Sequence, residues 1–169
     1  MASRRTFLQV GAAASLALAL GGRVYRATRA EEPPHAFALG GEARAALGAI
    51  VPVLLAGAMV AGTDPAAMID HVQQAILALP LAAQHDIQDL FGLLALAPAR
   101  RVLTGISVAW SSAAPADVQA FLQEWRVSQF GMLRSAYGAL HDLVLGAWYA
   151  APASWDAIGY SGPLLERAP

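Results

Sequence analysis

The chain has 169 residues, a length that suits one ordinary domain and is short for two. It contains no cysteine, which excludes a disulfide, an iron–sulfur cluster, a c-type haem attachment, a thiolate nucleophile and a lipoprotein anchor. All 12 acidic residues follow residue 30, so the chain beyond it is net acidic and has no basic stripe, which argues against a nucleic-acid partner.

The first 30 residues have the organisation of an export signal. They match the twin-arginine signature, Ser-Arg-Arg-x-Phe-Leu followed by a polar residue, at Ser3, Arg4, Arg5, Phe7 and Leu8. An uncharged run over 6–22 follows, and Thr28 and Ala30 occupy −3 and −1 of a candidate cleavage site. We therefore expect residues 1–30 to direct export of the folded protein to the periplasm through the twin-arginine (Tat) translocon. Without cleavage, the run would remain as a short membrane anchor.

Beyond a Pro- and Gly-containing linker over 31–41, the chain to residue 150 is predicted to be helical. The expected helices cover 42–60, 65–79, 81–96, 98–110, 115–126 and 129–149. Pro52 should bend or split the first of these, whereas Asp64 suits the N-cap and Pro65 the first position of the second. Asp117 should complement the helix dipole in the first turn of 115–126.

Apolar residues within these segments recur at intervals of three and four, which is typical of helices with one buried face. The stripes are formed by Met68, Val72, Ala75, Ile76 and Leu79, by Ile87, Leu90, Phe91 and Leu94, and by Leu133, Tyr137, Leu140, Val144 and Trp148. Gln84 is expected largely off the second stripe. The sequence thus predicts an all-α domain, a single small bundle of five or six helices over 42–150, followed by an irregular aromatic, Pro- and Gly-containing tail over 151–169.

No catalytic or metal-binding pattern can be recognised in the helical region. His71, His85 and His141 each neighbour an aspartate, but adjacent side chains on a helix point about 100° apart, so these pairs are not expected to act together. His85 and Asp89 could touch, yet they provide fewer than the three protein ligands of a catalytic zinc. No serine lies in a Gly-x-Ser-x-Gly elbow, and no phosphate-binding or dinucleotide-binding loop is present. We expect no cofactor, no metal and no catalysis in this chain. A small enzyme that uses His141 or the His85–Asp89 pair is the weakest alternative.

Aromatic residues gather toward the carboxyl end of the chain, where seven of the 13 lie between residues 125 and 160. Such a tail either covers the bundle or offers large rings to a partner, because rings on irregular segments make good interface anchors. The candidate partner surface comprises Tyr137, His141, Trp148, Tyr149, Trp155 and Tyr160.

These features together are similar to a known family. The residues that carry the similarity are the twin-arginine start and a Leu-Arg-x-Ala-Tyr…Leu…Trp-Tyr stretch formed by Leu133, Arg134, Ala136, Tyr137, Leu143, Trp148 and Tyr149. On them, the chain resembles the gluconate 2-dehydrogenase subunit 3 family, the twin-arginine-signal small subunits of periplasmic flavin dehydrogenases. The ending over 159–163 resembles a subgroup of such proteins. The better-known sugar dehydrogenase small subunits have a cysteine-containing carboxyl-terminal segment, which is absent here.

The resemblance implies a role in export and maturation. In that family the small subunit acts as a hitch-hiker chaperone for a large FAD subunit of the glucose–methanol–choline (GMC) type, which a cytochrome c often completes. It implies that FAD lies in the partner and that this chain is a non-catalytic subunit of an oxidoreductase complex. The alternative reading is a free-standing periplasmic helical protein that binds an apolar ligand.

Overall fold

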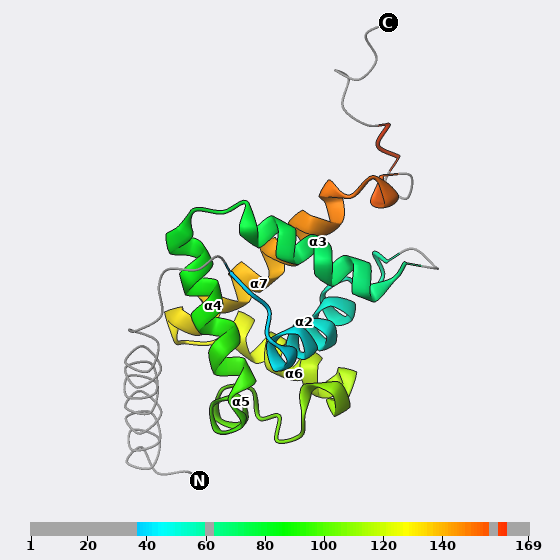
Figure 1. Ribbon diagram of the computed structural model, residues 1–169. Coiled ribbons are helices and arrows are strands. Elements are labelled where there is room, and N and C mark those ends of the chain that lie inside the picture. The colour runs from blue at the N-terminus through cyan, green and yellow to red at the C-terminus, as the bar shows by residue number, and fades with distance from the viewer. Residues whose placement is uncertain (1–36, 60–62, 156–158, 162–169) are drawn as a thin grey trace, which may run out of the picture.

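The protein folds as a bundle of helices (Figure 1). The structure, a computed structural model, describes residues 37–59, 63–155 and 159–161, and these ranges contain six α-helices, two short 3-10 helices and no strand. The elements are α2 (Gly41–Leu54), α3 (Pro65–Leu77), α4 (Leu81–Ala95), α5 (Ala97–Thr104), η1 (Trp110–Ser112), α6 (Pro115–Arg126), α7 (Gly131–Ala150) and η2 (Pro152–Ser154). The all-α bundle predicted from the sequence is confirmed.

Helix α2 lies at the centre of the bundle and contacts α3, α4, η1, α6 and α7. Its buried face is formed by Ala43, Ala46, Leu47, Ile50 and Val51. The predicted helix over 42–60 is too long, because α2 ends at Leu54. Pro52 lies in its last turn, where its missing N–H weakens the helix, and Gly57 then takes a φ of 83° that ends the helical path.

Helix α3 begins as its sequence predicts. The Asp64 carboxylate accepts a hydrogen bond from the Ala66 N–H at 2.9 Å, and Pro65 opens the helix. The predicted apolar stripe is buried at Met68, Val72 and Ile76.

Gln84 of α4 is a correction to the sequence prediction, because its side chain is buried on the same face as Ile87. The two residues are three apart, so they share one side of the helix. The Gln84 amide donates to the carbonyl groups of Leu77 and Leu79 at 3.1 and 2.8 Å and accepts from the Phe37 N–H at 3.3 Å. It therefore joins the α3–α4 turn to the chain before α2.

The end of the predicted linker also belongs to the bundle. Phe37 is 5% exposed, and its ring lies 6.3 Å from that of Phe91, measured between centroids. The Ala38 N–H donates to the side-chain oxygen of Gln88 at 3.1 Å. Residues 37 and 38 therefore pack against the bundle before α2 begins.

Helix α5 is shorter than the predicted helix over 98–110. It ends at Thr104, and Gly105 follows with a φ of 73°, a left-handed conformation that glycine adopts without a Cβ clash. The Thr104 hydroxyl donates to the Arg100 carbonyl at 2.8 Å and accepts from the Ile106 N–H at 3.2 Å. Trp110 consequently lies in the separate 3-10 helix η1.

Aromatic side chains connect these elements in the core. The Phe121 ring makes edge-on contacts with Trp110 and Trp125, with centroid distances of 5.9 and 5.4 Å. Both indole N–H groups are satisfied by backbone carbonyls, that of Trp110 by Leu94 and that of Trp125 by Leu103, each at 2.8 Å. Helix α6 begins at Pro115 as predicted, and α7 packs against α3 and α6.

Candidate functional site

The predicted partner surface is built on the carboxyl-terminal end of α7. The buried face of this helix carries Leu140, Val144, Ala147 and Trp148. Trp148 is only 3% exposed, so it supports the surface from beneath and its own ring is largely out of reach of a partner. Because successive helical residues differ in direction by about 100°, the next residue, Tyr149, points outward and is 44% exposed.

The chain folds back on itself directly after α7. The Trp155 indole N–H donates to the Tyr149 backbone carbonyl at 3.0 Å, and the Tyr160 N–H donates to the Trp155 carbonyl at 2.9 Å. The Trp155 and Tyr160 rings meet edge to face, with centroids 5.2 Å apart and planes at 79°. Hydrogen bonds and a ring contact thus fix these three residues relative to the end of the helix. We refer to Tyr149, Trp155 and Tyr160 as the aromatic tip.

The aromatic tip lies at one extremity of the bundle. In Figure 1 the last turns of α7 and the short helix η2 extend past α3 at the upper end of the molecule, away from the central α2. Tyr149 and Tyr160 both keep nearly half of their surface exposed. The side chains of the tip are therefore held in place before a partner binds. A partner would bind this aromatic surface at a small cost in conformational entropy.

Tyr137 and His141 lie one turn apart in the middle of α7. Both are half-buried, and their ring centroids are 5.7 Å apart. The His141 Nδ1 lies 3.0 Å from the Asp142 Oδ1, so the expectation that adjacent histidine and aspartate side chains cannot act together is wrong at this position. Both side chains lie at the surface, where their χ angles bring the two tips together despite the 100° between their Cβ directions. Along the helix, His141 lies about 12 Å and Tyr137 about 18 Å from Tyr149.

The remaining candidate histidines lie at the surface of other helices. His71 of α3 and His85 of α4 are exposed, and Asp89 is half-buried on α4. In the part of the chain that the structure describes, no group of three or more histidine and carboxylate side chains could hold a metal ion.

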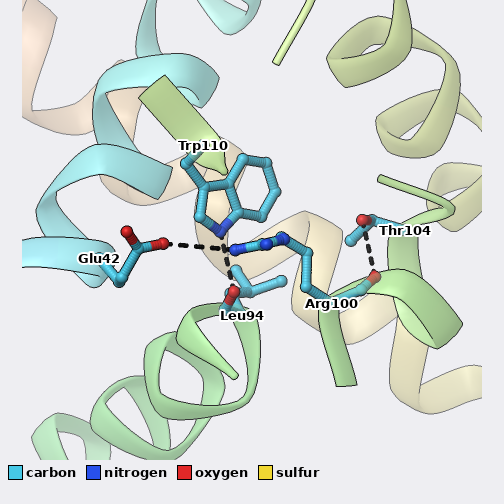
Figure 2. Close-up of polar contacts among 5 residues, drawn as sticks. All are labelled: Glu42, Leu94, Arg100, Thr104 and Trp110. Atoms are coloured by element: carbon cyan, nitrogen blue, oxygen red, sulfur yellow. Dashed lines mark hydrogen bonds and ion pairs between the residues drawn. The ribbon is translucent and has the colours of Figure 1, made fainter. Parts of the chain in front are cut away.

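Sequence reasoning missed a buried arginine between α5 and the first turn of α2. Arg100 is 5% exposed, and its Nη1 donates to the Glu42 Oε2 at 3.3 Å (Figure 2). Its guanidinium carbon lies 5.9 Å from the centre of the Trp110 ring. Among the described residues, Arg100 Nε is a buried nitrogen without a hydrogen-bond partner. The Trp110 N–H points away to the Leu94 carbonyl, as Figure 2 shows.

This arrangement stabilises the buried charge only in part. The 3.3 Å contact is long for a charge-assisted hydrogen bond, and the Glu42 side chain is 52% exposed, so water weakens the attraction. Glu42 also complements the dipole of α2, because it lies in the first turn of that helix. We interpret the Arg100–Glu42–Trp110 cluster as a structural junction, since a single side chain ties α5, α2 and η1 together.

Open grooves border α2. The larger, of about 540 Å³, is mainly apolar and is lined by small residues of α2 such as Ala45 and Ala49, together with Ile69 and Trp110. The smaller, of about 400 Å³, lies between the start of α2 and α4 and is lined by Gln88 among others. Both open to solvent, unlike the closed dry pocket expected of a carrier that encloses an apolar ligand.

Comparisons of the chain with protein-family models, with curated proteins and with solved structures find no match. Membership of the gluconate 2-dehydrogenase subunit 3 family therefore stays a prediction from the twin-arginine start and the residues between 133 and 149 that resemble that family. Several of them, such as Leu133, Ala136 and Leu143, pack against the core as in any amphipathic helix. Tyr137 also packs against the core, whereas Tyr149 is exposed and is more specific to a surface function.

The predicted export signal lies outside the described residues. Ser3, Arg4, Arg5, Phe7 and Leu8 all belong to the segment 1–36, and the twin-arginine signature remains a prediction from the sequence. Within the described ranges, none of the helices is both long enough and apolar enough to cross a membrane.

Proposed function

We propose that this chain is a non-catalytic small subunit that escorts a larger FAD-dependent dehydrogenase of the GMC type to the periplasm and helps it to mature or to remain stable. The observation that carries the proposal is the aromatic tip, which is exposed and held in place by hydrogen bonds at one end of the bundle. FAD would lie in the partner, and a cytochrome c could complete the complex.

The chemistry of the tip suits an interface with another protein. The Trp155 N–H is already bonded within the chain, so its ring can lose water without leaving a polar group unsatisfied. The Tyr149 and Tyr160 rings are amphipathic, since each combines an apolar face with a hydroxyl that can bond at the edge of a contact. Tyrosine and tryptophan residues of this kind dominate the binding energy of many protein interfaces.

The amino-terminal sequence supports the proposal that this chain carries the larger subunit across the membrane. A twin-arginine signal exports proteins that have already folded, and the sequence of this domain offers no recognisable cofactor motif of its own. A signal of this kind on such a domain is economical if the folded cargo is another chain that lacks a signal.

The export step is tested with the signal arginines. Changing Arg4→Lys together with Arg5→Lys should leave the dehydrogenase activity of the partner in the cytoplasm, as measured by cell fractionation. The matched control is Arg23→Lys with Arg26→Lys, which alters arginines after the uncharged run and should leave export unchanged. A partner that still reaches the periplasm with the first variant contradicts the proposal.

The contact itself is tested by capture of the partner. The tagged full chain should retain a yellow protein with flavin absorbance, and Tyr149→Ala with Tyr160→Ala should release it. The control Phe130→Ala with Met132→Ala removes equally exposed apolar side chains at the other end of α7 and should retain the flavoprotein. Loss of capture in the control alone would place the interface at the amino end of α7 and contradict the role proposed for the aromatic tip.

The second candidate is a free-standing binder of an apolar ligand, which would have to hold its ligand in the larger, open groove beside α2. This function predicts a stable monomer that carries no flavoprotein and binds an apolar fluorescent dye in the groove. Ala49→Leu should fill the groove and abolish dye binding, whereas Tyr149→Ala should not. Capture of a flavoprotein by the aromatic tip would instead support the escort function.

A further inference from the structure

A second exposed apolar surface lies at the opposite end of α7, and neither the fold nor the proposed escort function uses it. Val127, Phe130 and Met132 are 77, 49 and 59% exposed around the connection between α6 and α7. Val102 of α5 is 62% exposed and lies at the same end, because the Trp125 side chain bonds the carbonyl of the following residue. We refer to Val102, Val127, Phe130 and Met132 as the apolar corner.

The backbone of the apolar corner is fixed. The Phe130 N–H donates to the Ser128 Oγ at 3.1 Å, and the Arg134 guanidinium donates to the Ser128 carbonyl at 2.5 Å. The Leu133 N–H donates to the Phe130 carbonyl at 3.1 Å as α7 begins. The apolar side chains therefore project from a hydrogen-bonded turn. Single exposed apolar residues are ordinary, but several gathered at one corner mark a surface that contacts something apolar.

Charge is distributed unevenly around this corner. Residues 101 to 134 contain three arginines, all of them exposed, and two acidic residues, Asp117 and Glu124. The other described residues contain two arginines and six acidic residues, so the rest of the bundle is acidic. The three exposed arginines are Arg101, Arg126 and Arg134. Each of the last two lies within two residues of a member of the apolar corner, and Arg101 is adjacent to Val102.

The arginines beside the apolar corner indicate what it can bind. Its size alone does not, because the four side chains of the corner and the three of the aromatic tip each supply only a small part of the about 800 Å² that a stable protein interface buries on each partner. A lipid surface makes no such demand, because a few apolar side chains can enter the acyl boundary while neighbouring arginines bind the headgroups. Arginine beside apolar side chains complements a surface of negative charge over hydrocarbon.

We propose that the apolar corner docks the bundle onto an anionic phospholipid surface. Val127, Phe130 and Met132 enter the acyl boundary, and the arginines beside them bind headgroup phosphates. This site is independent of the escort function, because α7 is about 30 Å long and leaves the aromatic tip at its other end free for a protein.

The proposal is tested by flotation of the full chain with vesicles of phosphatidylglycerol and phosphatidylcholine. Phe130→Ser with Met132→Ser should weaken binding at least about tenfold. Arg101→Gln with Arg126→Gln should weaken it about 25-fold, since each arginine near an anionic surface contributes about fivefold. Leu81→Ser is the matched control for Met132→Ser, because Leu81 is 60% exposed on a different helix, and it should bind as the wild type does. Far-ultraviolet circular dichroism checks that each variant keeps its helices.

A local probe separates the corner from any membrane binding by the leader. The chain has no cysteine, so Met132→Cys and Leu81→Cys each provide a single position for an environment-sensitive dye. Anionic vesicles should shift the emission of the dye at 132 to the blue and leave the dye at 81 unchanged. Vesicles of phosphatidylcholine alone and inorganic phosphate alone should shift neither.

Three results would overturn the proposal. The first is flotation without a shift at 132, which would assign binding to the leader. The second is a shift caused by inorganic phosphate alone, which would make the arginines a site for free phosphate. The third is unchanged vesicle binding by the corner variants together with loss of flavoprotein capture, which would make the corner a protein interface.

Discussion

The two ends of α7 both expose apolar side chains, but they are constructed differently. At the carboxyl end, Trp155 and Tyr160 are in ring contact, and the Trp155 N–H is bonded to the chain. At the amino end, Phe130 and Met132 project separately from a turn with exposed arginines beside them. Rings held in contact with one another suit a shaped protein surface, whereas separate apolar side chains among arginines suit a fluid anionic one.

Exposed apolar area alone therefore does not define a binding partner. The polar groups beside that area define it, because they determine which surface can approach without leaving a charge or an N–H group unsatisfied. One helix can carry both surfaces since its middle, around Leu140 and Val144, is held in the core.

The largest expected effect separates the tip from the core beneath it. Trp148→Ala should lower the free energy of unfolding by about 3–5 kcal/mol, because removal of a buried ring leaves a cavity. Tyr149→Ala, one residue further, should change it by less than about 0.5 kcal/mol. Urea unfolding followed by circular dichroism measures both. Equal losses would show that the tip is part of the core.

A smaller effect is expected at the Arg100–Glu42–Trp110 cluster, which joins α5, α2 and η1. Glu42→Ala should lower the free energy of unfolding by about 1–3 kcal/mol, because the buried Arg100 guanidinium then lacks its carboxylate. Asp70→Ala removes the exposed pair with Arg44, whose atoms are 2.6 Å apart, and should cost less than about 1 kcal/mol. Thermal unfolding checks the order, and the reverse order would contradict a structural role for Arg100.

The order of the aromatic tip is tested by removing one hydrogen bond. Trp155→Phe keeps an aromatic ring but loses the N–H that binds the Tyr149 carbonyl. The loss of this hydrogen bond should lower the free energy of local unfolding of the tip by about 1 kcal/mol. Amide hydrogen exchange at Tyr160 should become about fivefold faster. Exchange at Arg134, whose N–H bonds the Phe130 carbonyl at the other end, is the internal control. Unchanged exchange at Tyr160 would show that the tip is ordered by other contacts.

The smallest effect is expected at the apolar corner. Ser128→Ala removes the hydroxyl that accepts from the Phe130 N–H, and should lower the free energy of unfolding by about 0.5 kcal/mol since the turn is exposed. Exchange at Phe130 should rise, whereas exchange at Tyr160 should not change. A response at both ends would mean that the two surfaces are coupled through α7.

Local chemistry made much of the fold predictable. The start of α3 follows from Asp64 and Pro65, and the start of α6 from Pro115, because caps and proline act on their own turn of helix. The errors arose where a helix stops. Gly57 and Gly105 both take a positive φ, and a glycine in a sequence shows only that this conformation is allowed.

The candidate site was predictable in part. Aromatic enrichment identified Tyr149, Trp155 and Tyr160, which the structure brings together at one end of α7. Helical spacing in the sequence already indicated that Trp148 would be buried and Tyr149 would not. Val144 and Trp148 are one turn apart on the stripe that was predicted to be apolar, and Tyr149 lies off it. The contact between His141 and Asp142 was missed because it depends on the side-chain torsions of two surface residues.

The sequence by itself determined the helices, their buried stripes and the aromatic carboxyl end, because these depend on residues within one or two turns of each other. Only the tertiary structure decided that Arg100 is buried while Arg101 is exposed, and that Phe130 and Met132 face water. Burial depends on which helices pack on a given face, and that depends on residues distant in the chain. Adjacent arginines look alike in a sequence, and so do apolar residues of the core and of an exposed corner.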